Sequence, residues 1–554
     1  MVQKSMDLDD ACRQERTPDV LALLARTSDC RALTPTLLEF AATSSDVRVL
    51  QAVLHNDGNP NCGIDGGKTL LFFAMQQGHN DKVKLLLDAR ADLASPIDER
   101  GMLPLHYACV ARLGLAGLLV ERNANVNATS AFKRGATPLM LACGSKQADV
   151  AHLLVDRNAD VNAKDQKKCT ALHYACTAGD YKIARWLVNE LGVNAKKVVS
   201  SGETALHYAA AACNERLVKF LIQQGCSVDA RDGGGKTPLA IAAAYDHGRR
   251  APIVQMLLSH CANVNGARLG GMTPLLFACL AENFAAAKRL VDAGADVDAR
   301  GPDGWTGLFY AAKNNNLEIA RLLTNSGCDL KVRVEQRSVL WHAVVESWPN
   351  FAALLGEYQR RGVAWEGDLL HVACKKSNRS AIAALLRAGV DVNTRDAGFT
   401  TALLHAVQGK DLRSVSMLLR AGADTEGALL ACFQTRNFPD WEECAEMIVQ
   451  HGGDVKSMLC WVVDQCSVKD LQPSIFKNVD FLLKHGADVQ YTLERWRDDV
   501  PENQEFWAAL FRAECEEKMV ALMFGLREKQ GEKSLVRRLN EDVWKMVWGE
   551  LLRV

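Results

Sequence analysis

Two segments of the sequence place a Gly-Lys-Thr triplet directly before an apolar run, as phosphate-binding loops do. One lies in DGGGKTPLAIAAA, residues 232–244, and the other at residues 67–69. A loop that cradles phosphates needs the pattern G-x-x-x-x-G-K-[ST], because its first glycine turns the backbone so that successive N–H groups face the phosphate oxygens. Ala230 and Cys62 stand where that glycine is required. We therefore expect no nucleotide site at either triplet.

Histidine and cysteine are the other side chains whose spacing could support chemistry. His106, His173, His207 and His371 recur in similar heptapeptides, but at one per packed helix pair they would lie about 10 Å apart and could not converge on one metal ion. The 18 cysteines include no C-x-x-C pair, so we expect reduced thiols in small core positions. No serine, cysteine or carboxylate lies in a recognisable nucleophile motif. The sequence therefore predicts no enzyme activity, cofactor or metal.

Length and charge limit the class of protein. With 554 residues, the chain corresponds to three or four domains or to one extended array. A formal net charge of −1 gives no general attraction to nucleic acid or to an anionic membrane. Residues 1–15 lack the apolar core of a signal peptide, and no later window reaches the roughly 20 apolar residues of a membrane helix. We expect a soluble, monomeric, intracellular protein of the cytoplasm or nucleus, without nucleic-acid partners or membrane insertion.

A short motif of the form T-x-L-x-x-A recurs along the chain at intervals of about 33 residues. The motif or its degenerate form begins at Thr36, Thr69, Leu103, Thr137, Thr170, Thr204, Thr237, Thr273, Thr306, Ser338, Asp368 and Thr401. Two further degenerate repeats begin near Glu426 and Ser457. A period of this length predicts an array of short helical units, none of which can bury its apolar faces alone, so neighbours must stack.

The internal pattern of the repeats carries a family resemblance. TALHYAC at residues 170–176 and LPLHYAC at 103–109 resemble the ankyrin signature TPLHxA, and NADVNAKD at 158–165 resembles the family's second hallmark. The resemblance covers roughly residues 30–492. It implies an all-α solenoid of about 13 or 14 repeats, in which each helix pair is followed by an extended finger that ends in a β-turn. It also implies non-catalytic binding of a protein partner on the concave face.

The same resemblance accounts for the chemical candidates above. Both Gly-Lys-Thr triplets fall on the turn that enters the first helix of a repeat. There, residues 233–235 are expected to form a tight turn, and Thr237 to cap the helix that Pro238 opens. The resemblance further implies that the recurring histidines hydrogen-bond across the turn to their own or a neighbouring finger.

Finger residues are the first candidates for partner contacts. Most fingers carry a small or polar residue just before the Thr position, but Met102, Met272 and Trp305 are apolar there, and Phe399 lies one residue further upstream in its repeat. Arg134 is a further finger candidate. Exposed Met and aromatic side chains are frequent contact anchors. Packing against the next finger is the equal alternative for these apolar residues.

Insertions are the second set of candidates, because they protrude from an array without disturbing its stacking. The segment AYDHGRRAPIV, residues 244–254, adds three residues between two helices and presents Arg249 and Arg250. Larger irregularities lie at residues 466–476 and 436–441. Each is either a binding loop or a neutral surface excursion.

The erosion of the motif after Ser338 suggests a boundary or a kink within the array near residues 335–366. We expect four regions along the chain. These are capping helices at residues 1–33, regular repeats at 34–335, degenerate repeats at 336–492, and a helical segment at 493–554.

The carboxy-terminal segment carries an apolar stripe at helical spacing. It resembles the opening of an F-box, and a truncated F-box-like tail follows the repeats in poxvirus ankyrin proteins. Asn540 departs from that pattern, which has proline there. A rival resemblance is to the SOCS box, whose start Ser534 and Leu535 match, although Leu539 replaces its cysteine. Either family implies a substrate receptor of a cullin-type ubiquitin ligase, whereas a plain helix would cap the last repeat. The candidate docking residues are Leu539, Val543, Trp544, Val547 and Leu551.

Overall fold

The fold is known from a computed structural model, which resolves most of the repeats into helices. It describes residues 2–25, 34–56, 58–64, 68–98, 100–111, 114–244, 250–266, 271–435, 439–456, 458–459, 462 and 473–488. The chain divides into two compact units. Unit 1 is Met1–Asn314 with Asn325–Cys328, and unit 2 is Asn315–Thr324 with Asp329–Val554.

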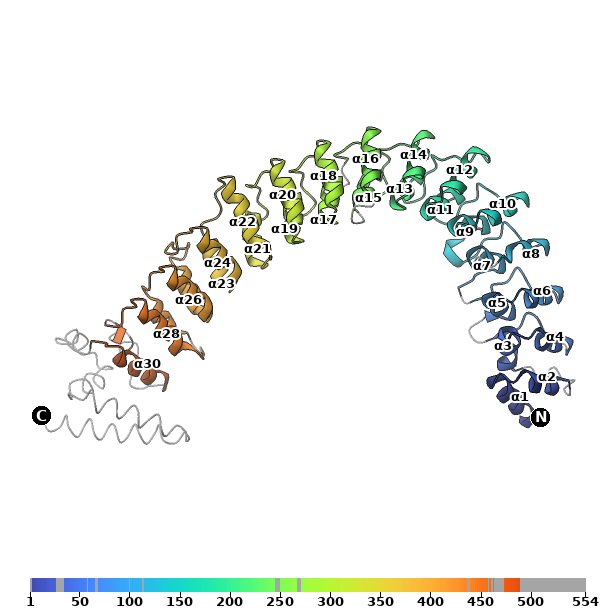
Figure 1. The fold of residues 1–554 in the computed structure, drawn as a ribbon, viewed down its shortest axis with the longest axis horizontal. Coiled ribbons are helices and arrows are strands. Elements are labelled where there is room, and N and C mark those ends of the chain that lie inside the picture. Colours follow the sequence, from blue (N-terminus) through green and yellow to red (C-terminus); the bar gives the residue numbers. More distant parts are fainter. Residues whose placement is uncertain are drawn as a thin grey trace. The chain divides into compact units, whose positions relative to one another are not determined.

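Unit 1 consists of successive helix pairs joined by short loops (Figure 1). Its helices are α1 (Val2–Arg13), α2 (Thr17–Leu24), α3 (Pro35–Thr43), α4 (Val47–His55), α5 (Leu70–Gln76), α6 (Asn80–Asp88), α7 (Pro104–Ala111), α8 (Ala116–Glu121), α9 (Pro138–Gly144), α10 (Ala148–Asp156), α11 (Ala171–Ala178), α12 (Tyr181–Asn189), α13 (Ala205–Ala211), α14 (Glu215–Gln223), α15 (Pro238–Ala244), α16 (Ala251–Ser259), α17 (Pro274–Leu280), α18 (Phe284–Asp292) and α19 (Gly307–Lys313). A short 3-10 helix, η3, spans Phe132–Arg134.

Unit 2 has the same organisation. It begins with α20 (Leu317–Asn325) and continues with α21 (Val339–Val345), α22 (Phe351–Arg360), α23 (Leu369–Lys375), α24 (Arg379–Arg387), α25 (Ala402–Gln408), α26 (Leu412–Arg420), α27 (Ala428–Gln434), α28 (Trp441–Gln450) and α30 (Pro473–Lys484). The degenerate motif from Ser338 onward therefore still forms helix pairs.

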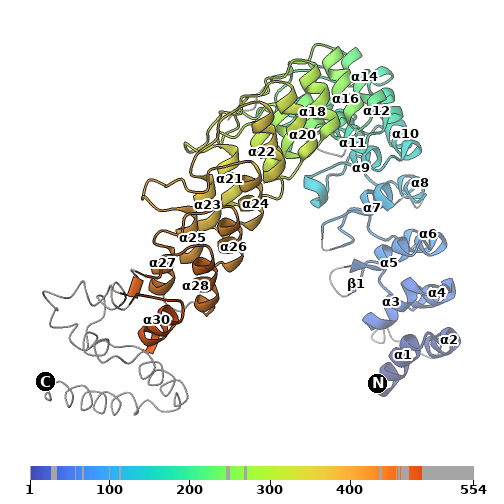
Figure 2. The same ribbon diagram turned by 60° about the vertical axis from the view of Figure 1, so that its left-hand side comes forward.

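Within each unit, the two helices of a repeat belong to different layers. In unit 1 the first helices stack on one another, as α9, α11, α13, α15 and α17 do, and the second helices stack likewise, as α12, α14, α16 and α18 do. The two layers are visible from a second direction in Figure 2. In unit 2 the same holds for α21, α23, α25 and α27, and for α22, α24, α26 and α28.

The repeat at Thr137 shows why these short helices form. Thr137 caps α9 by accepting a hydrogen bond from the Met140 N–H at 3.4 Å, and Pro138 supplies the first helical residue. Pro138 through Cys143 are all buried, whereas α10 buries only Ala151 and Leu154 and leaves its other face toward solvent. A seven-residue helix is not stable alone, so the stacking of neighbouring first helices holds α9 together.

The fingers contain the few extended residues of the described chain. Strands β1 (Gly63–Ile64) and β2 (Lys68–Thr69) pair antiparallel, and isolated bridges join Val198 to Thr204 and Arg395 to Thr401. The expected all-α solenoid with β-turn fingers is confirmed. So is the expected role of Thr237, whose Oγ1 accepts from the Ala240 N–H at 3.2 Å, as is the turn before it, where Gly235 has φ +75°. One helix differs in detail, because α3 begins at Pro35 with Thr34, two residues before the motif, as its cap.

Candidate partner-binding surface

Several finger tips are organised by an aspartate. In the finger before α11, Asp165 Oδ1 accepts from the backbone N–H groups of Lys167 at 2.9 Å and Cys169 at 2.7 Å. Its Oδ2 accepts from the Tyr174 hydroxyl of α11 at 3.0 Å. The carboxylate thus accepts the free N–H groups of the turn and links the turn to α11, the helix that follows it. The tips around Asp98, Asp232 and Asp396 use the same pair of backbone hydrogen bonds.

Backbone hydrogen bonds join neighbouring fingers to one another. The Gln166 N–H donates to the Arg134 carbonyl at 3.0 Å, and the Ser200 N–H donates to the Lys167 carbonyl at 2.8 Å. The next link is the Gly233 N–H to the Ser201 carbonyl at 2.7 Å. Four consecutive fingers of unit 1 therefore form one connected tier. A surface built from such turns is rigid before any partner arrives, which lowers the entropic cost of binding.

The recurring histidines connect repeats. His173 Nε2 lies 3.2 Å from the Lys197 carbonyl, and His207 Nε2 lies 3.1 Å from the Lys236 carbonyl, in each case in the finger of the following repeat. His106 and His371 make the equivalent contact. The expected hydrogen bonds from these histidines to a finger are confirmed. Burial is the main cause that lowers the pKa of His106, His173 and His207, so these imidazoles are neutral at pH 7.

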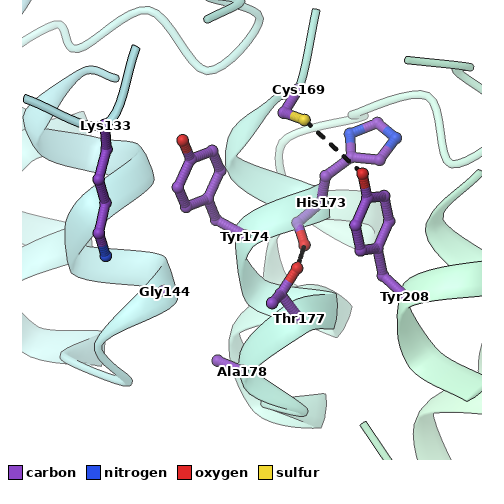
Figure 3. Close-up of a pocket in the computed structure, with 8 residues that line it drawn as sticks. All are labelled: Lys133, Gly144, Cys169, His173, Tyr174, Thr177, Ala178 and Tyr208. Atoms are coloured by element: carbon purple, nitrogen blue, oxygen red, sulfur yellow. Dashed lines mark hydrogen bonds between the residues drawn. The ribbon is translucent and has the colours of Figure 1, made fainter. Parts of the chain in front are cut away.

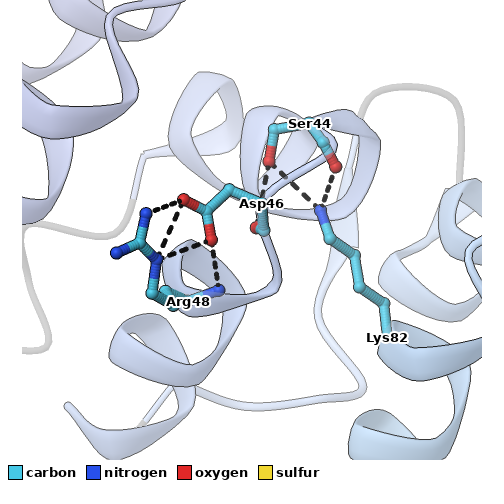
Figure 4. A network of polar contacts seen from close by, with 4 residues as sticks. All are labelled: Ser44, Asp46, Arg48 and Lys82. Atoms are coloured by element: carbon cyan, nitrogen blue, oxygen red, sulfur yellow. Dashed lines mark hydrogen bonds and ion pairs between the residues drawn. The ribbon is translucent and has the colours of Figure 1, made fainter.

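Polar side chains of one repeat also donate hydrogen bonds to carbonyls at the end of the first helix, or in the loop after it, of the preceding repeat. Lys82 of α6 is 1% exposed, and its ammonium donates to the Ala41 carbonyl at 2.6 Å. It also donates to the Ser44 carbonyl and to Ser44 Oγ at 3.1 Å (Figure 4). These carbonyls lie at the carboxy-terminal end of α3, where a positive charge is favoured. Burial nevertheless lowers the pKa of Lys82 to about 8. Asn214 and Asn378 bridge to the preceding repeat in the same way, donating to the carbonyls of Gly179 at 2.7 Å and Val344 at 3.0 Å.

A pocket of about 260 Å³ is lined by residues of three consecutive repeats. Tyr174 of α11 and Tyr208 of α13 form its walls, with Lys133 at one side and Cys169 above (Figure 3). Burial raises the pKa of both phenols, so they are neutral hydroxyls. The Tyr208 hydroxyl lies 3.9 Å from Cys169 Sγ, and that of Tyr174 is bound to Asp165.

The apolar finger candidates differ in how deeply their side chains are buried. Met102 and Met272 are 5% and 6% exposed, so their side chains are in the core rather than at the surface. Met272 Sδ lies 3.9 Å from the Tyr310 hydroxyl of the next repeat. The alternatives for these methionines were contact with a partner and packing within the array, and the structure shows packing. Trp305 is half-buried against Tyr310, and the Lys313 ammonium lies 4.7 Å from its ring centroid.

The remaining candidates for partner contacts also differ in exposure. Phe399 is 79% exposed at a finger tip, and Arg134 is exposed on the finger before α9. Arg250 is half-buried and donates to the Ala211 carbonyl at 2.6 Å, so it supports stacking on α13 instead of protruding. Arg249 lies outside the described residues. The same is true of the tail candidates Leu539, Val543, Trp544, Val547 and Leu551.

Comparison with known families agrees with this geometry. A family model described as ankyrin repeats in three copies matches residues 38–130, 118–198, 189–268, 233–301, 248–334 and 275–362. A model described as many copies of ankyrin repeats matches residues 370–419. Together these segments cover more than half of the chain. The chain belongs to the ankyrin repeat family.

Individual ankyrin-repeat relatives match part of the chain. Human ankyrin repeat and SOCS box protein 16 is 29% identical over 223 residues, which are 36% of this chain and 49% of that protein. The mouse B-cell lymphoma 3 protein homolog is 29% identical over 219 residues, which are 38% of this chain and 48% of that protein. The crystal structure of the human ASB11 ankyrin repeat domain is 28% identical with a TM-score of 0.35, covering 40% of this chain and 98% of that one. The chain thus spans about half the length of the curated relatives it matches.

Membership in the ankyrin repeat family indicates a general class of activity. Ankyrin repeats form protein-interaction scaffolds, and such proteins are in general non-catalytic. Among the described residues, no cluster of three or more histidine, cysteine, aspartate or glutamate side chains could hold a metal ion. Within the same part of the chain, no helix is both long and apolar enough to cross a membrane.

Proposed function

We propose that this ankyrin array binds a partner protein on its finger tips and first helices, and that Phe399 is an anchor of the contact in unit 2. The exposure of Phe399 carries the proposal. An aromatic ring that is 79% exposed at a turn gains little from folding, and aromatic side chains of this kind are enriched at the centres of protein interfaces.

Phe399 also occupies a backbone position that favours glycine. Its φ is +58°, and its N–H closes the turn onto the Asp396 carbonyl at 2.9 Å. Glycine fills the equivalent place in the fingers at Gly101, Gly235 and Gly304. A residue with a side chain costs about 1–2 kcal/mol in this conformation. Strain retained at an exposed site is more typical of binding residues than of structural ones.

The turn that presents Phe399 is held on both sides. Asp396 accepts from the N–H groups of Gly398 and Thr400, each at 2.9 Å, and its other oxygen lies 2.8 Å from His405 Nε2. The hydrogen bond from His405 is the main cause that lowers the pKa of Asp396 to about 2, so the carboxylate stays ionised at neutral pH. The ring is therefore displayed on a preorganised turn, which favours affinity.

The test compares two glycine substitutions in the same repeat. Phe399→Gly removes the ring and relieves the positive φ. Lys410→Gly relieves a positive φ of +57° in the loop between α25 and α26, outside the finger sequence. Each full-length variant is used to capture partners from lysate, which are identified by mass spectrometry and then measured for affinity. We expect Phe399→Gly to weaken binding at least tenfold, as the loss of an interface anchor does, and Lys410→Gly to leave it unchanged. Equal affinity in both variants would refute the role of Phe399.

A second role is suggested by the tail and by one relative. Human ankyrin repeat and SOCS box protein 16 has a SOCS box in its name, and Ser534, Leu535 and Val543 of this chain match the start of such a box. We propose as the alternative function that the array selects a substrate for a cullin-type ubiquitin ligase, which docks through the carboxy-terminal segment.

Truncation distinguishes the adaptor from a simple scaffold. The full chain, and a version ending at Gln490, are each used to capture partners. Ligase subunits captured only by the full chain would support the adaptor role, and their absence from both samples would refute it. Val543→Asp with Leu551→Asp separates docking from capping. A docking helix should lose the ligase with the melting of the array unchanged, whereas a cap should destabilise the terminal repeats by several kcal/mol.

The state of the cysteines supports an intracellular location. The described cysteines are free thiols, and most of them are buried, such as Cys109, Cys143 and Cys176. Burial raises the pKa of the Cys109 thiol to about 12, which makes it unreactive at neutral pH. Such thiols are typical of proteins of a reducing compartment, so we infer action in the cytoplasm or nucleus.

A further inference from the structure

Three consecutive fingers of unit 1 each carry a pair of basic residues. The first two pairs lie at the finger tips, and the third lies at the start of its finger, before the tip turn at residues 199–202. These fingers precede α9, α11 and α13, and the pairs define a surface that we name the basic tract. Its members are Lys133, Arg134, Lys167, Lys168, Lys196 and Lys197. All are exposed except Lys197, which is half-buried and donates to Asn162 Oδ1 at 2.8 Å. The whole chain has a net charge of only −1, so this is a local concentration of charge.

The two carboxylates at these finger tips, Asp165 and Glu203, are outnumbered by the six basic residues of the tract. Asp165 is 8% exposed and is used by two backbone N–H groups and the Tyr174 hydroxyl. Glu203, which is half-buried, accepts from Ser201 Oγ. Within the described segments, Arg134, Lys167, Lys168 and Lys196 form no ion pair. The tract therefore presents a positive potential to an incoming partner.

Three basic residues of the tract have a left-handed backbone conformation, which is strained for a residue with a side chain. Lys133, Arg134 and Lys168 have φ values of +48°, +60° and +63°. Lys168 closes its turn onto the Asp165 carbonyl at 2.8 Å, in the place that Gly235 fills in a later finger. Glycine would relieve the strain of the left-handed conformation at such a position. Like charges on adjoining fingers add repulsion, so folding alone gives no reason to keep them.

The pocket adjoining the tract extends the surface with a less polar site. The walls of the pocket are Tyr174 and Tyr208, and Lys133 lies at its rim (Figure 3). Its volume of about 260 Å³ is below the 300–1,000 Å³ of typical small-molecule sites. It is better suited to one side chain of a protein partner. Because Asp165 and Cys169 already engage the two hydroxyls, the pocket mainly offers ring surface.

We propose that the basic tract binds an extended acidic segment of a protein partner, with one apolar side chain of that segment in the tyrosine pocket. Neighbouring fingers stack at about 10 Å, the spacing of packed helices. An extended chain advances about 3.3 Å per residue, so a carboxylate at every third position meets each finger in turn. This proposal rests on protein binding at the finger surface, but it concerns unit 1 and is independent of Phe399.

Purified components test the proposal without a natural partner. Fluorescence anisotropy measures binding of the full chain to a labelled peptide of about ten residues, with glutamate at every third position and a central leucine. A second peptide has the same composition with its glutamates adjacent, and a third replaces the leucine by serine. A single-stranded oligonucleotide of equal charge tests nucleic acid as the ligand. We expect the spaced peptide to bind most tightly and its affinity to fall with added salt.

Variants of the chain locate the binding site. Lys167→Ala with Lys168→Gly removes two tract charges and keeps the positive φ acceptable. The matched control, Arg216→Ala with Lys219→Ala, removes two exposed charges from α14. We expect the tract variant to bind the spaced peptide about tenfold more weakly, the order expected for loss of charge complementarity, and the control to bind normally.

Each opposite result overturns the proposal. These results are equal loss in both variants, no preference for the spaced peptide over the adjacent one, no effect of the serine replacement, or tighter binding of the oligonucleotide. If the peptide fails while Phe399→Gly still abolishes capture of a natural partner, the basic tract is refuted and the proposed function stands. Peptide binding with no effect of Phe399→Gly gives the reverse conclusion.

Discussion

Replacing Gly202 by alanine should break the contact between two neighbouring fingers of unit 1. Gly202 has φ +85°, and an added Cβ would lie 2.6 Å from the Gly233 nitrogen and 2.9 Å from the Asp232 carbonyl carbon. Both atoms are backbone and cannot move aside without shifting the next finger. The same shift would strain the hydrogen bond from the Gly233 N–H to the Ser201 carbonyl.

A matched glycine gives the reference for the magnitude. Gly304 lies at the same place in a later finger with φ +77°, and a Cβ there would meet nothing within 4 Å. Gly304→Ala should therefore lower the free energy of unfolding only by the strain of a left-handed backbone at a residue with a side chain, about 1–2 kcal/mol. Gly202→Ala adds overpacking of about 1–3 kcal/mol and a weakened hydrogen bond of about 0.5–1.5 kcal/mol. We expect a difference of about 2–4 kcal/mol between the two variants.

Hydrogen exchange on the full-length protein measures the effect locally. Stability differs along a repeat array, so a single melting temperature would average over the chain. A loss of 2.8 kcal/mol accelerates exchange through local opening about a hundredfold. That acceleration should appear in α13 and α15 for Gly202→Ala, and a much smaller one in α17 and α19 for Gly304→Ala. Equal acceleration in both variants would refute the interlocking of the fingers.

Two further predictions concern pH. Burial lowers the folded-state pKa of His173 and His207, so the unfolded chain binds more protons than the folded one as pH falls below about 6.5. The free energy of unfolding of the central repeats should therefore decrease between pH 7 and pH 5, and His173→Gln with His207→Gln should reduce this dependence in hydrogen-exchange measurements. For Lys82 the folded pKa is about 8 and the unfolded value about 10.4, so stability of the first repeats should rise from pH 8 to pH 10. Lys82→Met should abolish that rise, and an unchanged rise in the variant would contradict the assignment.

Features with a local cause could be predicted from the sequence. Thr137 and Thr237 cap their helices because a threonine before a proline satisfies a free N–H at the helix start. The recurring motif located the helix pairs, and the family resemblance supplied the bond from His173 to the following finger. The near-miss Gly-Lys-Thr triplet at residues 235–237 was correctly interpreted as a turn and a cap.

Features that depend on contacts between repeats could not be predicted. Met272 and Phe399 were equal candidates in the sequence, yet Met272 packs on Tyr310, 38 residues away, while Phe399 is exposed. From the sequence, Lys82 is expected to be a polar surface residue of an amphipathic helix. In the structure it is bound to the carbonyl of Ala41, 41 residues earlier in the chain. The repeat period fixes which elements stack, but not which side chain at each position reaches its neighbour.

The basic tract shows the same limit at the level of a surface. Its pairs at residues 133–134, 167–168 and 196–197 are unremarkable in a chain with 65 basic and 66 acidic residues. Only the hydrogen bonds between fingers bring the first two pairs side by side, and the third pair lies at the start of the next finger. The exposure of these pairs, and the engagement of Asp165 by the turn, required the folded structure.

Binding of partners at the finger tips can be tested by a hydrogen-exchange footprint of the full chain with and without a captured partner. We expect protection at finger tips such as residues 165–169 and 396–400, on the side of the first helices. Protection confined to second helices such as α14 and α26, with exchange at the finger tips unchanged, would contradict it.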